Sequence, residues 1–144
     1  MRFMIILKAD QNTEAGVMPS EKLLTEMTKY NEELVKAGVM LAGEGLQPTA
    51  KGAKVKFNGA ARSVTEGPFP LSGGTIAGFW IFQVKSRDEA IAWVKRCPNP
   101  LEGEAEIEIR QIFEAADFGA EFTPELQAAE ERMRATIEAN AKRK

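Results

Sequence analysis

Apolar residues in this chain follow two different periods, and each change of period separates a strand from a helix. Residues 2–9 and 75–84 are apolar at almost every position, and 75–84 is the most hydrophobic stretch. Strands that are apolar on both faces are typical of a sheet that is buried from both sides. Both segments are therefore predicted to be strands, with 75–84 in the centre of the sheet.

Helical spacing follows each of these strands. Residues 21–37 carry one apolar stripe, with Ser20 as a suitable N-cap and Gly38 suited to the left-handed position after the helix. A Ser-x-x-Glu sequence at 86–89 predicts a capping box and a second helix, which ends near Cys97. The stripe of the first helix consists of Leu23, Leu24, Met27, Tyr30, Leu34 and Val35.

The remaining strands are shorter. Residues 39–42 begin one, and residues 104–112 alternate so that Ala105, Ile107 and Ile109 face a core from an edge of the sheet. Between them, 53–65 reads as a hairpin with Asn58-Gly59 as its turn. That turn would place five residues on one face, with a single charge among them: Val55, Phe57, Ala60, Arg62 and Val64.

The order of elements is β-α-β, an inserted hairpin, β-α-β and a last helix from Thr123-Pro124. This order predicts an α+β fold, a ferredoxin-like split βαβ sheet with an inserted β-hairpin and a C-terminal helix. We expect a main domain over 1–114, and a linker with a thinly apolar helix over 115–144. Two helices cover only one face of such a sheet, so pairing of two sheets in a homodimer, a dimeric α/β barrel, is the simplest cover for the other.

Amino-acid composition limits the kinds of catalytic and metal site that the chain can form. The chain has 144 residues, no histidine, one cysteine and a net charge of −2. Without histidine, zinc sites, Ser-His and Cys-His pairs and histidine-held haem are excluded, and we expect no metal and no cofactor. Scattered basic residues argue against nucleic acid, and no apolar run suits a membrane helix. With no signal peptide in view and a single cysteine, we expect a cytoplasmic protein.

Several short motifs resemble the YCII-related family, and within it the branch named for an Asp-Gly-Pro-Phe motif. They occur in the family's order over residues 1–112 and are Gly43-Glu44-Gly45-Leu46-Gln47-Pro48, Val64-Thr65-Glu66-Gly67-Pro68-Phe69, Gly78-Phe79-Trp80, and Glu89-Ala90 with Trp93 and Pro98. The resemblance implies a dimeric α+β barrel with a small-molecule pocket between the sheets and the motif loop. Related barrels include muconolactone-isomerase-like enzymes, small monooxygenases and a dehydrochlorinase.

The chain departs from this family in two places. Glu66 replaces the aspartate of the motif, and residues 70–74, Pro-Leu-Ser-Gly-Gly, follow where an acidic and lysine-containing stretch is common. The His-Asp pair proposed as catalytic in the other branch cannot form, because the chain has no histidine. Any carried-over mechanism would therefore have to use carboxylates.

Two glutamates are the catalytic candidates. Glu66, in the EGPF loop, is interpreted either as a general base or as a turn residue that accepts the N–H groups of Gly67 and Phe69. Glu44, between two glycines at a strand end, is either a base in a close-packed site or a solvated carboxylate at a bulge.

Four other residues are candidates for ligand binding. Arg62 would bind an anion or lie along the apolar surface with its head in water. Lys8 would pair with Glu44 or Glu66, or only mark a strand end. Phe69 either lines the pocket or holds the loop, and Ser72 either presents N–H groups to an oxyanion or lies in a flexible loop. Cys97 is expected to be a small core residue.

Three functions remain open. The first is a cofactor-free enzyme for proton transfer or elimination on a small molecule. The second is a ligand-binding or accessory module without catalysis, and the third is a structural dimer whose last helix recruits a partner.

Overall fold

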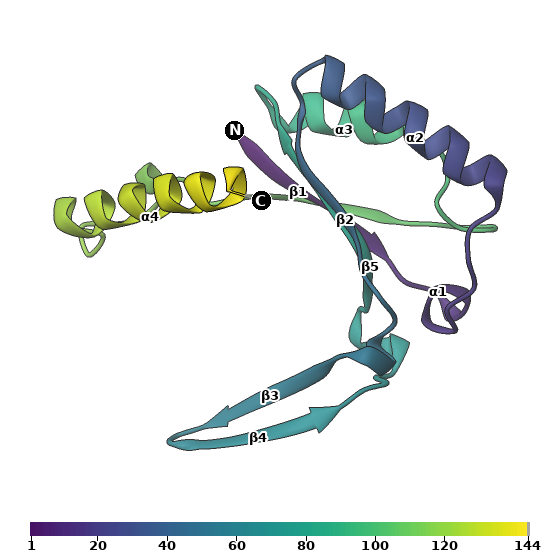
Figure 1. Cartoon of the computed structure of the whole chain (residues 1–144), viewed down its shortest axis with the longest axis horizontal. Coiled ribbons are helices and arrows are strands. Elements are labelled where there is room, and N and C mark those ends of the chain that lie inside the picture. The colour runs from purple at the N-terminus through teal and green to yellow at the C-terminus, as the bar shows by residue number, and fades with distance from the viewer. Residues whose placement is uncertain (144) are drawn as a thin grey trace. The chain divides into compact units, whose positions relative to one another are not determined.

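The computed structural model describes residues 1–143 and contains a four-stranded antiparallel sheet in the order β2-β5-β1-β6 (Figure 1). This is the predicted ferredoxin-like arrangement, with the two hydrophobic strands in the centre. The strands are β1 (Arg2–Lys8), β2 (Met40–Gly45), β5 (Ile76–Gln83) and β6 (Ile107–Gln111).

Helices α2 (Glu21–Lys36) and α3 (Arg87–Lys95) lie on one face of this sheet (Figure 1). Between sheet and helices lies the core, where the fully buried large side chains are Phe3, Ile5, Leu34 and Phe82. Trp80 ties the layers together, because its indole N–H donates to the Asn31 side-chain oxygen at 3.0 Å. Burying such side chains contributes about 1.5–3 kcal/mol each, which makes this layer the main source of stability.

Both helices begin where the sequence predicts. Ser20 caps α2 by accepting the Leu23 N–H, and Gly38 follows the helix with φ of 70°. Ser86 caps α3 by accepting the Glu89 N–H. The second half of the predicted box is wrong, because the Glu89 carboxylate accepts from the Lys85 N–H rather than from Ser86.

Four details of the predicted elements are wrong. The stripe of α2 is narrower, because Leu24 and Val35 are exposed. The loop before α2 contains a short helix, α1 (Gln11–Glu14), which Asp10 and Thr13 cap reciprocally. The last strand starts at Ile107, three residues later than expected, and α3 ends at Lys95 rather than near Cys97.

The inserted hairpin consists of β3 (Ala53–Asn58) and β4 (Ala61–Glu66), and we call it the arm (Figure 1). Its turn is Gly59-Ala60 rather than Asn58-Gly59, since Asn58 pairs with Ala61. Gly59 has φ of 58°, a conformation that glycine adopts without strain, so it takes the first turn position. The shift moves Ala60 into the turn and off the apolar face.

A second compact unit starts at Phe113. Within it, the rings of Phe113, Phe118 and Phe122 contact one another around the short turn η3 (Ala115–Asp117). The helix α4 (Pro124–Lys142) follows, capped by Thr123 with proline at its first position, as predicted. Three apolar residues on this helix are at least half exposed: Leu126, Met133 and Ile137.

Candidate functional site

The face of the sheet opposite α2 and α3, which we call the open face, is apolar in the middle and charged at one end. Strand register places Ile6 beside Phe79 and Met4 beside Ile81 on this face. Ile6 is buried, the other three are half-buried, and Ile76 near the end of the sheet is exposed. Both central strands are thus apolar on both sides, as the sequence indicates, while the helices cover only one side.

Glu44 lies on the open face directly beside Phe79, because these two residues pair in the β2–β5 ladder. Continuing across the sheet, Phe79 pairs with Ile6 and Ile6 with Glu108. One row therefore runs from a carboxylate, over two apolar side chains, to a second carboxylate. Neighbouring strands lie about 4.8 Å apart, so the two carboxylate residues are separated by roughly 14 Å at the backbone. They cannot act together on one small group, and their roles must differ.

Lys8 and Glu108 form an ion pair on this face. The Lys8 Nζ lies 3.0 Å from a Glu108 oxygen, and both side chains are about one-third exposed (30% and 39%). Arg110 lies nearby, with its Nε 3.7 Å from the other Glu108 oxygen. The predicted pairing of Lys8 with Glu44 or Glu66 is wrong, because β1 lies between β5 and β6 and brings Lys8 to Glu108.

These charges gather at one end of the sheet, where β1 and β2 end and β5 and β6 begin. The EGPF loop, residues 66–69, leads into that same end, because only the short turn η2 (Leu71–Gly73) and three residues separate it from β5. Glu44, Lys8 and Glu108 therefore lie at the end of the open face that is nearest the motif loop.

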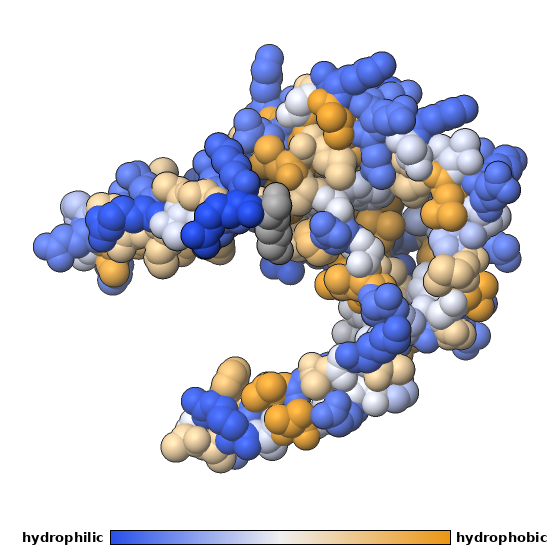
Figure 2. All heavy atoms as spheres, in the orientation of Figure 1, coloured by the Kyte–Doolittle hydropathy of each residue, from blue (hydrophilic) through white to orange (hydrophobic). Residues whose placement is uncertain are grey.

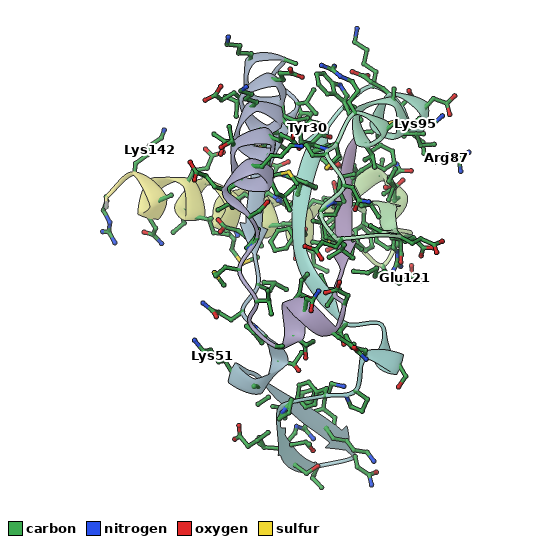
Figure 3. All side chains as sticks on the ribbon, turned by 90° about the vertical axis from the view of Figure 1, so that its right-hand side faces the viewer. Tyr30, Lys51, Arg87, Lys95, Glu121 and Lys142 are labelled. Carbon is green, nitrogen blue, oxygen red and sulfur yellow. The ribbon has the colours of Figure 1, made fainter. Side chains whose placement is uncertain are left out.

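The motif loop is held by a hydrogen-bond network that starts on α1. A carboxylate oxygen of Glu14 accepts the Thr49 N–H at 3.0 Å, and the other accepts the Thr49 hydroxyl. The same hydroxyl oxygen accepts the Phe69 N–H at 3.0 Å. Thr49 belongs to η1 (Thr49–Lys51), beside the base of the arm, where the labelled Lys51 shows its position in Figure 3.

Gly67 has no room for a side chain. Its N–H donates to the Gly52 carbonyl at 2.9 Å, and a Cβ at this position would overlap the Thr49 carbonyl. The Phe69 ring is half-buried under the Lys54 ammonium, which lies 4.3 Å from the ring centre. In this motif, the Gly and Phe positions therefore fix the root of the arm.

Glu66 occupies the last position of β4, pairs with Ala53 and is exposed. The N–H groups of Gly67 and Phe69 bond to Gly52 and Thr49, so the turn-capping interpretation of Glu66 is wrong. Glu66 shares an arm face with Arg62, whose guanidinium lies 4.4 Å from the Phe57 ring and donates to the Gly59 and Ala61 carbonyls.

Ser72 is exposed in η2. Of the six predicted site residues, the structure thus brings Glu44 and Lys8 onto one face. It places Arg62 and Glu66 on the arm, Phe69 in the motif loop and Ser72 in η2.

A shallow hollow of about 280 Å³ lies elsewhere on this unit, between α1, the start of α2 and residues 99–102. None of the six predicted residues lines it. Its walls combine Val17, Met18, Leu23 and Leu101 with the side chains of Lys22 and Glu26.

Two titratable groups in the helical layer are shifted by burial. The Tyr30 hydroxyl donates to the Trp93 carbonyl at 2.7 Å, and burial raises its pKa well above the usual value of 10.0 (Figure 3). Burial also raises the pKa of the Cys97 thiol to about 11, and the sulfur lies 3.2 Å from the Pro98 carbonyl oxygen. A half-buried protonated thiol is a poor nucleophile, in agreement with the core role expected for Cys97.

Residues 1–143 contain no group of three or more carboxylate or cysteine side chains arranged to hold a metal ion. Over the same residues, none of the helices combines the length and apolar character needed to cross a membrane.

Sequence reasoning missed three residues of this region. Glu108 is predicted to face water because apolar and polar residues alternate along its strand. This alternation does not reveal that the solvent-facing side of the strand belongs to the open face. Glu14 lies in a segment read as loop, and Thr49 has no motif of its own. A signal for this helical turn exists in the sequence, because Asp10 and Thr13 have the types and the spacing of a reciprocal cap at a helix start.

The fold and the open face together define the class of protein, a small ferredoxin-like α+β domain with one apolar sheet face left uncovered by its helices. A family model described as the YCII-related domain matches residues 1–116. The chain therefore belongs to the YCII-related family.

One solved structure with a similar fold is the 5-chloro-2-hydroxyhydroquinone dehydrochlorinase from Burkholderia phenoliruptrix AC1100, in complex with 2,5-dihydroxybenzoquinone. The similarity covers 83% of this chain and 100% of that chain, with 15% sequence identity and a TM-score of 0.47. A search of curated proteins found no match.

Proposed function

We propose that this protein is a homodimer that binds a small molecule on an open face covered by the other protomer, at the end nearest the EGPF loop, and acts on it by cofactor-free proton transfer or elimination. The observation that supports this proposal is the position of Glu44, a carboxylate beside Phe79 at the margin of the apolar middle of the open face. Covering that surface removes water from Glu44, and a carboxylate without its hydration shell is a stronger base.

The ion pair on the same face has a second role in this proposal. Lys8 lies on the strand next to that of Phe79, Glu108 lies one strand further, and the two charges nearly neutralise each other. A polar ligand group can bind to the pair, while its apolar body lies on Phe79 and Ile6. In this arrangement Glu44 removes the proton, and Lys8 stabilises negative charge that develops on the ligand.

Glu66 is the second candidate for the base. Like Glu44, it is exposed within one chain, so either carboxylate can serve only if another surface covers it. The non-catalytic alternative, a ligand-binding or accessory module, uses the same face without proton transfer. Comparing two matched variants separates these possibilities.

The experiment starts from the purified protein, denatured to release any co-purifying compound for identification by mass spectrometry. That compound is then offered to the wild type, Glu44→Gln and Glu66→Gln. The proposal predicts that Glu44→Gln lowers the rate at least ~100-fold, the lower range for loss of a general base, while Glu66→Gln retains most of it.

A large loss in Glu66→Gln alone would move the base to the arm. A compound that binds tightly and is returned unchanged by the wild type would contradict catalysis and favour the binding module. A denatured wild type that releases no compound, with none bound from a panel of small aromatic acids, would contradict the site.

A further inference from the structure

The arm lacks cover of its own in this chain. All twelve residues of β3 and β4 are exposed, and Figure 1 shows the two strands extending away from the four-stranded sheet. A two-stranded hairpin alone is marginally stable in water and needs packing on one face. Something must therefore cover the arm.

The arm has one apolar face that is suited to such packing. Cross-strand pairing puts Val55 opposite Val64 and Phe57 opposite Arg62 on the same side. These apolar side chains are 53% (Val55), 69% (Phe57) and 62% (Val64) exposed, and apolar atoms of the arm are visible at the surface in Figure 2. Lys54, Lys56 and Ser63 lie on the other side, so the hairpin is amphipathic across its two faces.

Hydrogen bonds and close packing hold the root of the arm in one position. The Glu14–Thr49–Phe69 network, the Gly52–Gly67 hydrogen bond and the tight packing at Gly67 all act at its base. A hairpin that served only as a surface loop would not need a fixed direction. A fixed direction orients a hairpin that docks on another surface and lowers the entropy lost on binding.

Charge and apolar surface indicate what the arm docks on. The apolar face of the arm also carries Arg62 and Glu66, one charge of each sign. The open face likewise carries charges of both signs, from Glu44, Lys8 and Glu108, so a second copy of this chain offers charges opposite to those of the arm. It also presents apolar side chains that are half-buried (Phe79 and Ile81) or exposed (Ile76).

We propose that the arm is exchanged in the dimer, so that the arm of each protomer lies with Val55, Phe57 and Val64 on the open face of the other. This inference rests on the proposed homodimer and deepens it. Two-fold symmetry makes the contact reciprocal, because each chain carries one arm and one open face.

The exchange completes the small-molecule site. Arg62 is held at the arm's tip by the Gly59 and Ala61 carbonyls and lies over Phe57. On the partner's open face, where Lys8 is already paired with Glu108, it adds a guanidinium that favours a ligand with an anionic group. The site is then built from two chains.

The test is cross-linking between two single-cysteine proteins in a Cys97→Ser background. One carries Val64→Cys on the apolar face of the arm, and the other carries Ile81→Cys on the open face. The two are mixed, allowed to exchange subunits and treated with a short bismaleimide. The matched control replaces Val64→Cys by Ser63→Cys, the adjacent residue on the opposite face of the arm.

The proposal predicts a cross-linked dimer in the Val64→Cys mixture at a yield at least tenfold above the Ser63→Cys mixture. Equal yields, or no product from a sample that sedimentation shows to be dimeric, would overturn arm exchange while leaving the homodimer intact. A sample that sediments as a monomer would overturn both the exchange and the proposed dimer. Circular dichroism of each variant confirms that it is folded before it is mixed.

Discussion

Three glutamates show how position, rather than residue type, divides roles in this chain. Glu14 accepts two hydrogen bonds from Thr49 and holds the motif loop. Glu108 pairs with Lys8. Among the described residues, Glu44 has no hydrogen-bond or ion-pair partner for its carboxylate and lies beside Phe79, so it is the one of the three that is free to meet a ligand.

The root of the arm gives the sharpest prediction for a single residue. Gly67→Ala places a Cβ against the Thr49 carbonyl, and overpacking of this kind costs about 1–3 kcal/mol. Urea unfolding should show the variant destabilised by that amount. The matched control, Gly73→Ala, meets no atom within 4 Å and should stay within about 0.5 kcal/mol of the wild type. Equal stability of both variants would mean that the backbone around Gly67 yields easily.

Cys97 gives a prediction about pH. Burial raises its pKa from 9.0 to about 11, so between these values the unfolded chain has lost the proton that the native state keeps. The free energy of unfolding therefore falls as pH rises through this window, and the Cys97 contribution is fully present only below pH 9.

The Cys97→Ser variant isolates that contribution. Serine keeps a hydroxyl donor near the Pro98 carbonyl but does not titrate in this range. Urea titrations from pH 8 to pH 11 should show a shallower loss of stability in the variant, although Tyr30, whose pKa is also raised, contributes a slope to both proteins. Identical slopes would show that the thiol titrates at its ordinary pKa.

At the scale of elements, capping chemistry was readable from the sequence and exact register was not. Ser20, Ser86 and Thr123 each begin a helix as predicted, because a cap depends on residues within one turn. The hairpin turn was displaced by one residue, because Asn58-Gly59 and Gly59-Ala60 are both acceptable two-residue turns. The choice depends on pairing at the root of the arm, where Glu66 meets Ala53.

The last helix is predicted to dock on its own dimer. Leu126, Met133 and Ile137 form a thin seam that is largely exposed, and a helix gains most of its stability in proteins from tertiary packing. Truncation after Phe122 should lower the melting temperature of the protein. Hydrogen exchange offers the contrary outcome, since exchange in residues 124–141 as fast as in an unfolded peptide would show a helix without a docking surface.

At the scale of the whole molecule, the sequence predicted the sheet, its central strands and the need for a cover. It could do so because the alternation and the doubly apolar strands are local patterns. The candidate site was harder to predict from the sequence. Glu44, Lys8 and Glu108 come to one face and one end of the sheet only through the strand order β2-β5-β1-β6. No spacing along the chain reveals which residues share a row across four strands.

The open face also explains why the proposed function depends on the proposed dimer. Phe79, Ile81 and Met4 are half-buried and Ile76 is exposed in the single chain, and the proposed base, ion pair and docking surface of the arm all lie on this one face. If the face is not buried between two protomers, the environment that activates Glu44 does not form.

Sedimentation equilibrium of the wild-type protein at micromolar concentration tests this claim most directly. We predict a single species of about twice 15.8 kDa, which dissociates when Ile81→Lys places a charge in the middle of the open face and persists when Lys56→Ser changes the outer face of the arm. A wild-type protein that sediments as a stable, monodisperse monomer would contradict the account, because its apolar sheet face would then be exposed to water.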